Sequence, residues 1–138
     1  MSATVPENYH DLLEGPVVVS FTTLMPDGMP QTTPVWCLWD GENVLINTTK
    51  SRQKACNVRT NPKVNVMALD PTNPYRYVEI RGEVVNITEE GGLENINQLA
   101  KLYRGVDSYY GGVTPADLQE RETREIITIK PVKVSAMG

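Results

Sequence analysis

The segment 48–54 contains residue types that together bind phosphate. Hydroxyl and cationic side chains follow one another there: Thr48, Thr49, Lys50, Ser51, Arg52 and Lys54. The segment follows a predicted strand and begins a predicted helix, so its cations crowd a helix N-terminus where the dipole is already positive. A bound phosphate would relieve this repulsion, because it can accept hydrogen bonds from the first-turn N–H groups, the hydroxyls and the cations.

The distribution of charge along the chain also indicates an anion site. The sequence has 13 Lys and Arg against 17 Asp and Glu, a net charge of −4. No acidic residue occurs between Glu42 and Asp70, although five cations fall there: Lys50, Arg52, Lys54, Arg59 and Lys63. Such a cationic window predicts a bound anion. A solvated basic face, or a surface touching acidic residues of a partner subunit, is the alternative.

Other chemistry has little support in this sequence. The chain has one histidine, His10, and two cysteines, Cys37 and Cys56, which lack Cys-x-x-Cys spacing. We therefore predict no metal site and no histidine-based catalytic triad. Glycine-rich phosphate loops and G-x-S-x-G are absent, so the sequence does not support a P-loop ATPase, a Rossmann dehydrogenase or an α/β-hydrolase. Both cysteines are expected to be buried small hydrophobic residues.

Composition and hydropathy predict the partners and the cellular location of the protein. The acidic balance argues against nucleic acid as a partner, although a single-stranded nucleic-acid surface on an OB-like barrel is an alternative for the cationic window. No apolar stretch is long enough to span a membrane, and the first residues lack signal-peptide features. We therefore predict a cytoplasmic protein with no membrane or nucleic-acid partner.

The elements that must position segment 48–54 are mostly strands. β-branched residues and turn signals predict strands at 17–25, 31–39, 44–48, 64–69, 75–87 and 126–134. Pro34 should interrupt the second strand and free its backbone for a ligand, while Gly82 and Pro131 should mark a bulge and a bend. Helices are predicted at 51–60 with Ser51 as N-cap, at 89–104 after Thr88 and before Gly105, and at 115–124.

These elements predict a mainly β fold. A chain of 138 residues is expected to form one domain, 1–138, with a complete core. Six antiparallel strands with few helices most simply close into a small β-barrel flanked by helices.

Several segments occur in the order found in a known family. They are 28–36 (GMPQTTPVW), Asp40-Gly41, 48–54 (TTKSRQK) and 57–63 (NVRTNPK), followed by 75–82 (YRYVEIRG) and 102–105 (LYRG). With these segments the chain resembles the split β-barrel superfamily of pyridoxamine-phosphate-oxidase-like proteins, and more closely its deazaflavin-dependent branch. The resemblance covers nearly the whole chain. It implies an FMN-binding-like split β-barrel that forms a homodimer with a cofactor groove between the subunits.

The resemblance also implies which residues hold the cofactor, coenzyme F420 or alternatively FMN. Its phosphate would lie at segment 48–54, and its tricyclic ring along Pro34, Val35 and Trp36. The complete predicted set is Thr32, Pro34, Val35, Trp36, Thr48, Thr49, Lys50, Ser51, Arg52, Lys54, Tyr75, Tyr77 and Tyr110. Tyr103 is a further candidate for the groove or substrate pocket, and the loop 109–112 is expected to be either a lid or a plain surface loop.

The implied function is hydride transfer, which requires no nucleophile or metal from the protein. We predict an oxidoreductase that uses F420 to reduce a small conjugated substrate. An FMN-dependent oxidoreductase of the same fold, or a non-catalytic carrier of the coenzyme or of a tetrapyrrole-like ligand, is the alternative. Authentic pyridoxamine-phosphate oxidases carry Arg-x-x-x-Leu-Lys where this chain has 32–37, and their C-terminal arginine motif has no match in 129–134. Vitamin B6 oxidation is therefore not expected. Cys37 stands where the deazaflavin branch usually has an aromatic residue, so FMN remains the alternative cofactor.

Overall fold

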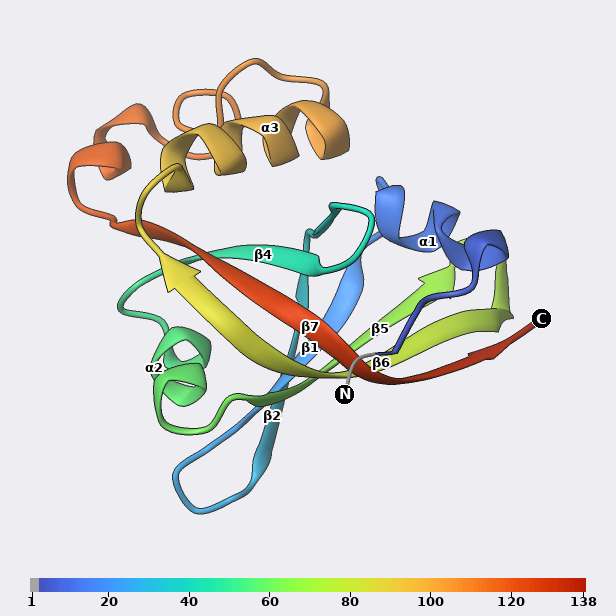
Figure 1. The fold of residues 1–138 in the computed structure, drawn as a ribbon. Coiled ribbons are helices and arrows are strands. Elements are labelled where there is room, and N and C mark those ends of the chain that lie inside the picture. The colour runs from blue at the N-terminus through green and yellow to red at the C-terminus, as the bar shows by residue number, and fades with distance from the viewer. Residues whose placement is uncertain (1–2) are drawn as a thin grey trace.

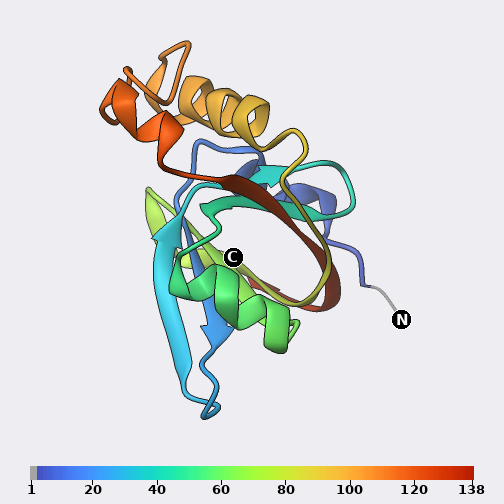
Figure 2. The ribbon, with the colours of Figure 1, turned by 90° about the vertical axis from the view of Figure 1, so that its left-hand side faces the viewer.

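The computed structural model describes residues 3–138 and is mainly β, as predicted (Figure 1). Its strands form one antiparallel sheet in the order β2-β1-β5-β6-β7-β4-β3. They are β1 (Val19–Leu24), β2 (Pro30–Val35), β3 (Leu38–Trp39), β4 (Val44–Thr49), β5 (Lys63–Asp70), β6 (Asn73–Thr88) and β7 (Arg124–Met137). The helical elements are η1 (Glu7–Tyr9), α1 (Asp11–Glu14), α2 (Gln53–Thr60), α3 (Gly92–Arg104) and η2 (Ala116–Glu120). Figure 2 shows that the sheet curls into an incomplete barrel.

The sheet has seven strands rather than the predicted six, because the predicted strand 31–39 is two strands. Pro34 does not interrupt the ladder as expected, since it pairs with Ser20 of β1 without a shift in register. β2 is an edge strand, and an edge strand accommodates a proline because its outer side has no partner. The chain instead leaves the ladder at Trp36 and Cys37, between β2 and β3.

The long strands β6 and β7 bend where the sequence predicts. Their pairing shifts register between Arg81 and Gly82, and again between Val84 and Asn86. Gly82 is required at the first shift, because a Cβ there would collide with the Ile129 side chain. Pro131 lies opposite Gly82, beyond the part of β7 that pairs with β4. These bends give the two strands the curvature that wraps the sheet around its core.

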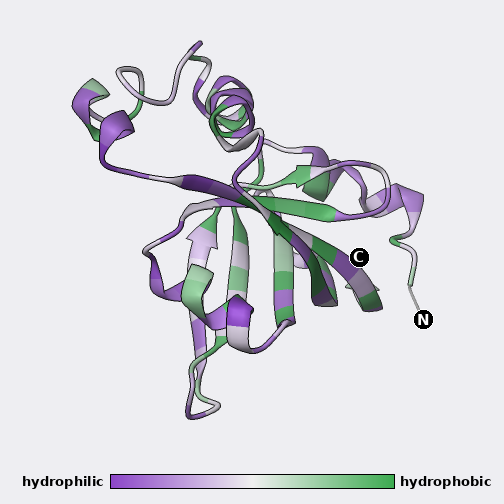
Figure 3. Ribbon diagram, turned by 60° about the vertical axis from the view of Figure 1, so that its left-hand side comes forward, coloured by the Kyte–Doolittle hydropathy of each residue, from purple (hydrophilic) through white to green (hydrophobic). Residues whose placement is uncertain are grey.

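The core fills the inside of the curl. Alternate residues of the strands are buried, among them Phe21, Ile46, Val66, Ile80 and Ile127. Their neighbours along each strand face outward, so hydrophobic and polar residues alternate along the ribbons in Figure 3. Leu12 and Leu13 of α1 are also fully buried and extend this core.

The helix that begins after segment 48–54 starts later than predicted. α2 begins at Gln53, its N-cap is Arg52, and no side chain caps it. Ser51 lies in the turn before Arg52 and is therefore not the N-cap. Cys56 is exposed on this helix, which corrects the expectation that both cysteines are buried; Cys37 is buried as expected.

The two later helices also differ from their predicted bounds. α3 begins at Gly92 rather than at residue 89, because Thr88 is still paired in β6 and Gly91 supplies the N-cap. Gly105 ends α3 in the left-handed conformation, as expected. The third predicted helix is only the short 3₁₀ turn η2. Within residues 3–138, no helix is both long and apolar enough to cross a bilayer.

Candidate functional site

A cavity of about 360 Å³ lies where β2, β4, α2, α3 and β7 approach one another. Its volume falls in the range of roughly 300–1,000 Å³ typical of small-molecule sites. One part of its wall is cationic and hydroxylated, and another is apolar and aromatic. The wall consists of Val18, Pro34, Val35, Trp36, Asn47, Thr48, Arg52, Lys54, Ile96, Leu99, Tyr109, Val113 and Arg124.

Lys54 is the residue that most directly indicates an anion. It lies in the first turn of α2, yet only 8% of it is exposed. Its ammonium donates a hydrogen bond to Thr33 Oγ1 at 2.7 Å, and no carboxylate of residues 3–138 forms an ion pair with it. Burial, and then the charge of Arg52, lower the pKa of Lys54. A buried cation without a counter-ion is unfavourable, so this end of the cavity favours an anionic ligand.

Arg52 and Thr48 complete the cationic end. Arg52 is exposed at the uncapped N-terminus of α2, and Thr48 is buried at the end of β4. Both line the cavity beside Lys54. A helix N-terminus without a side-chain cap has N–H groups available to an anion, and a phosphate can use these together with the hydroxyl and the two cations. The residues present therefore fit a phosphate group.

The apolar end is formed where the chain leaves β2. The Trp36 ring stacks on Tyr103, with ring centroids 5.1 Å apart and planes 14° apart. Its other aromatic neighbour is Tyr109, which meets it edge-on at 6.0 Å. Trp36 lies outside both adjoining strands, so no ladder partner occupies its backbone groups. This wall suits a flat ring system that also needs backbone hydrogen bonds.

Arg124 is a cavity residue that the sequence analysis missed. Its guanidinium donates to the Tyr110 hydroxyl at 2.9 Å and to Glu122 at 3.2 Å, and it lies over the Tyr109 ring at 4.5 Å. These contacts fix the loop 109–112 against the cavity, where Tyr109 forms part of the wall. No local signal could have found Arg124, because β4 and β7 pair across most of the chain length.

The cavity brings together part of the predicted cofactor set. Six predicted residues line it, namely Pro34, Val35, Trp36, Thr48, Arg52 and Lys54. The wall residues outside the predicted cofactor set are Val18, Asn47, Ile96, Leu99, Tyr109, Val113 and Arg124; of these, Tyr109 belongs to the loop 109–112 that was a lid candidate. The sequence carried one signal for two of these residues: Ile96 and Leu99 have helical spacing in the predicted helix 89–104, so they were expected to share one face of it.

The remaining residues of segment 48–54 lie outside the cavity wall. Thr49 is buried and pairs with Arg124 in the ladder between β4 and β7. Lys50 points away and forms an exposed ion pair with Glu89 at 2.9 Å. Ser51 is exposed. Strand alternation and the turn before α2 therefore direct neighbouring side chains to different surroundings.

The structure also does not bring Thr32 or the other predicted tyrosines to the cavity wall. Thr32 is on the opposite face of β2 from Thr33, and its hydroxyl lies 2.8 Å from that of Thr22. Tyr75 is 81% exposed at the start of β6, and Tyr77 is half-buried opposite Leu69 of β5. Tyr110 is buried, with its hydroxyl donating to Glu122 at 2.8 Å.

The curled antiparallel sheet, with a cation-bearing cavity beside its edge strand, defines a split β-barrel protein. Residues 5–138 match the family model described as Pyridoxamine 5'-phosphate oxidase. The chain belongs to this family, which confirms the resemblance read from the sequence. No curated protein matches the chain.

Solved structures support the same assignment. An F420 reductase is 36% identical to this chain, with a TM-score of 0.80, covering 95% of this chain and 98% of its own. The conserved hypothetical protein Rv2991 from Mycobacterium tuberculosis is 23% identical, with a TM-score of 0.72 and coverages of 98% and 85%. General Stress Protein 26 from Bacillus anthracis is 16% identical, with a TM-score of 0.67 and coverages of 95% and 92%. The last two show similarity of fold alone.

Proposed function

We propose that this protein is an oxidoreductase that uses coenzyme F420 to transfer a hydride to a small conjugated substrate. The observation that carries the proposal is the two-ended cavity. At one end it has a buried Lys54 ammonium with no carboxylate partner among residues 3–138, and at the other end it has the Trp36 wall. Similarity to an F420 reductase at 36% identity supports the choice of cofactor.

In this proposal the chain binds, orients and shields the cofactor. Lys54, Arg52 and Thr48 hold its phosphate, and the N-terminus of α2 adds N–H donors. Trp36, Val35 and Val18 pack against the ring and keep water from it. The bound deazaflavin supplies the hydride. The protein's contribution to the rate is the fixed distance and angle between ring and substrate.

The test is a side-by-side titration of cofactor-stripped protein with F420 and with FMN, followed by fluorescence. We expect F420 to bind more tightly, and reduced F420 to be consumed with members of an enone and quinone panel. Tighter binding of FMN would identify FMN, rather than F420, as the cofactor. Tight binding of F420 without turnover of any substrate in the panel would indicate a carrier protein rather than an enzyme. Binding of neither would overturn the proposal.

We further propose that the protein is a homodimer, with a second copy closing the cofactor groove. A depression of about 300 Å³ lies on the outer face of β1, β2 and β5, and no charged side chain lines it. It shares Val18 and Pro34 with the cofactor cavity. Val18 is 53% exposed and Leu69 41% exposed, so this face presents apolar surface to solvent. A second copy covering it would also enclose the adjacent cavity.

Replacing Leu69 by aspartate should therefore dissociate the dimer. A charge buried in an apolar interface without a partner costs several kcal/mol, so the dissociation constant should rise by about a hundredfold or more. Sedimentation velocity over a concentration series measures this. Val132→Asp is the control, because Val132 is an exposed apolar residue outside the depression. A wild-type protein that sediments as a monomer would contradict the proposed dimer.

Two broader predictions stay proposals. Residues 1–138 are proposed to act as one domain, which agrees with a family model matching residues 5–138. A cytoplasmic location is proposed from the sequence alone, and fractionation of cells expressing the protein would test it.

A further inference from the structure

Tyr103 lies behind the ring-binding wall rather than in it. It comes from the last turn of α3, and its ring stacks on Trp36. Tyr103 does not itself line the cavity, whereas Trp36 does. Any effect of Tyr103 on a ligand must therefore pass through Trp36 and the backbone on either side of it.

The Tyr103 hydroxyl joins the two chain segments that border the cavity. It accepts a hydrogen bond from the Cys37 backbone N–H at 3.1 Å and donates to the Val17 carbonyl at 2.7 Å, with the Cys37 carbonyl a more distant acceptor at 3.3 Å. Cys37 directly follows Trp36, and Val17 directly precedes Val18; both Trp36 and Val18 are cavity residues. One hydroxyl thus links the chain after β2 to the chain before β1.

Burial makes the hydrogen bonds of the Tyr103 hydroxyl important for the backbone around it. Burial raises the pKa of Tyr103, so the group stays protonated and continues to donate. Cys37 is fully buried, and its N–H lies in the gap between β2 and β3, where the ladder supplies no partner. Without the hydroxyl, that buried N–H would lose its acceptor.

We propose that Tyr103 is a positioning residue that sets the spacing and orientation of the Trp36 wall for the cofactor ring. This inference rests on the proposed function, because it requires a ring to be bound at that wall. The stacked ring of Tyr103 fixes the plane of Trp36, and its hydroxyl fixes the backbone on which Trp36 stands.

The variant Tyr103→Phe distinguishes the contribution of the hydroxyl from that of the aromatic ring. The variant keeps the stacked aromatic ring and loses the contacts of the hydroxyl with the Cys37 backbone and the Val17 carbonyl. We expect its Kd for F420, measured by fluorescence at 10 °C, to rise about tenfold, with an increase in KM for F420 larger than the decrease in kcat.

Tyr9→Phe is the matched control. Tyr9 is a buried tyrosine whose hydroxyl donates to the Gly138 carbonyl at 3.1 Å, away from the cavity. We expect it to lower the midpoint of urea unfolding while leaving the Kd for F420 within about twofold. An unchanged Kd in Tyr103→Phe would overturn the inference. Failure of the wild-type protein to bind F420 or FMN would instead overturn the proposed function.

Discussion

Replacement of Lys54 by alanine should weaken F420 binding by about 10- to 100-fold. Hydrogen bonds to charged groups contribute roughly 1.5–3 kcal/mol, and Lys54 is the buried cation of the cavity. The protein itself should not lose stability, because within the described part of the chain the removed ammonium has only the neutral Thr33 hydroxyl as its side-chain partner. Fluorescence titration gives the affinity, and urea unfolding checks the fold.

Lys50→Ala is the matched control for this experiment. Both lysines belong to segment 48–54, but Lys50 is exposed, pairs with Glu89 and lies outside the cavity wall. Removal of Lys50 should leave F420 affinity within about twofold, because an exposed ion pair is screened and contributes little. Equal losses from the two variants would place the anion elsewhere in the cationic window.

The pH dependence of binding gives an independent readout of Lys54. Burial and the neighbouring charge of Arg52 lower the pKa of Lys54 from its ordinary value of 10.5. The protonated form attracts the phosphate, so affinity is complete below the lowered pKa and falls as pH rises through it. The fall should therefore begin at a lower pH than for an exposed lysine, and it should be absent from Lys54→Ala. A flat profile in the wild-type protein would contradict the role of Lys54.

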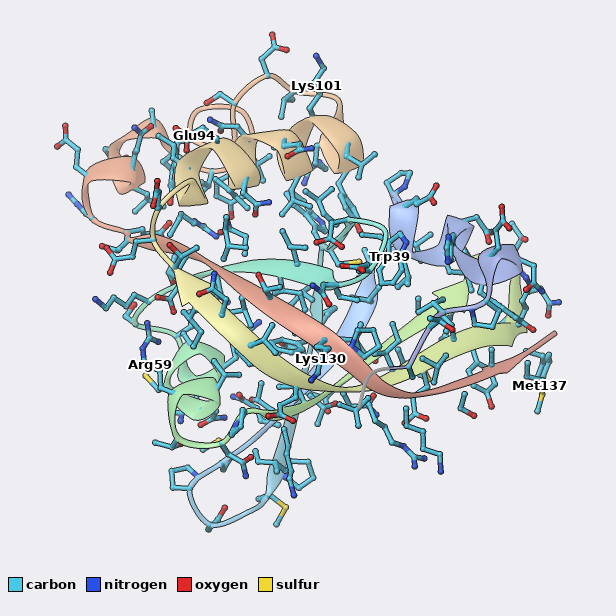
Figure 4. All side chains as sticks on the ribbon, in the orientation of Figure 1. Trp39, Arg59, Glu94, Lys101, Lys130 and Met137 are labelled. Carbon is cyan, nitrogen blue, oxygen red and sulfur yellow. The ribbon has the colours of Figure 1, made fainter. Side chains whose placement is uncertain are left out.

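Arg59→Ala should destabilise the protein by about 3 kcal/mol. Arg59, labelled in Figure 4, lies on α2 at the opposite end from Lys54. It forms an ion pair with Glu125 of β7. Only 1% of the Glu125 side chain is exposed, and its second carboxylate oxygen, Oε1, has no partner among residues 3–138. Loss of Arg59 would leave a buried carboxylate without a counter-ion. Urea unfolding measures the change.

The controls for Arg59 separate burial from charge. Arg81→Ala removes an ion pair with Glu79 in which Arg81 is largely exposed, so it should cost less than about 1 kcal/mol. Adding Glu125→Leu to Arg59→Ala should recover much of the lost stability, because no buried charge would remain. A small loss from Arg59→Ala alone, similar to that of Arg81→Ala, would show that Glu125 does not depend on this partner.

Much of the fold could be predicted from sequence because its signals are local. β-branched runs bounded by turns located the strands, and Gly82 and Pro131 marked the bend of β6 and β7. The predictions failed where local preference competed with pairing. Pro34 stayed in the ladder because β2 is at the edge of the sheet, and Thr88 stayed in β6 instead of capping α3. Whether a strand lies at the edge of the sheet, and where it ends, depends on which other strands pair with it, and local sequence does not contain this information.

The sequence by itself determined the chemistry of the cationic end of the candidate site. The cationic window in an acidic chain, with hydroxyls at a strand–helix junction, indicated an anion, and this reasoning identified Arg52, Lys54 and Thr48. Only the tertiary structure decided which neighbouring residues share the cavity. It turned Lys54 into the cavity and Lys50 out to Glu89, and it brought Arg124 beside β4 and Tyr103 behind Trp36. The reason is physical: residue type sets what a side chain can bind, whereas strand pairing and helix packing between distant segments set where it points.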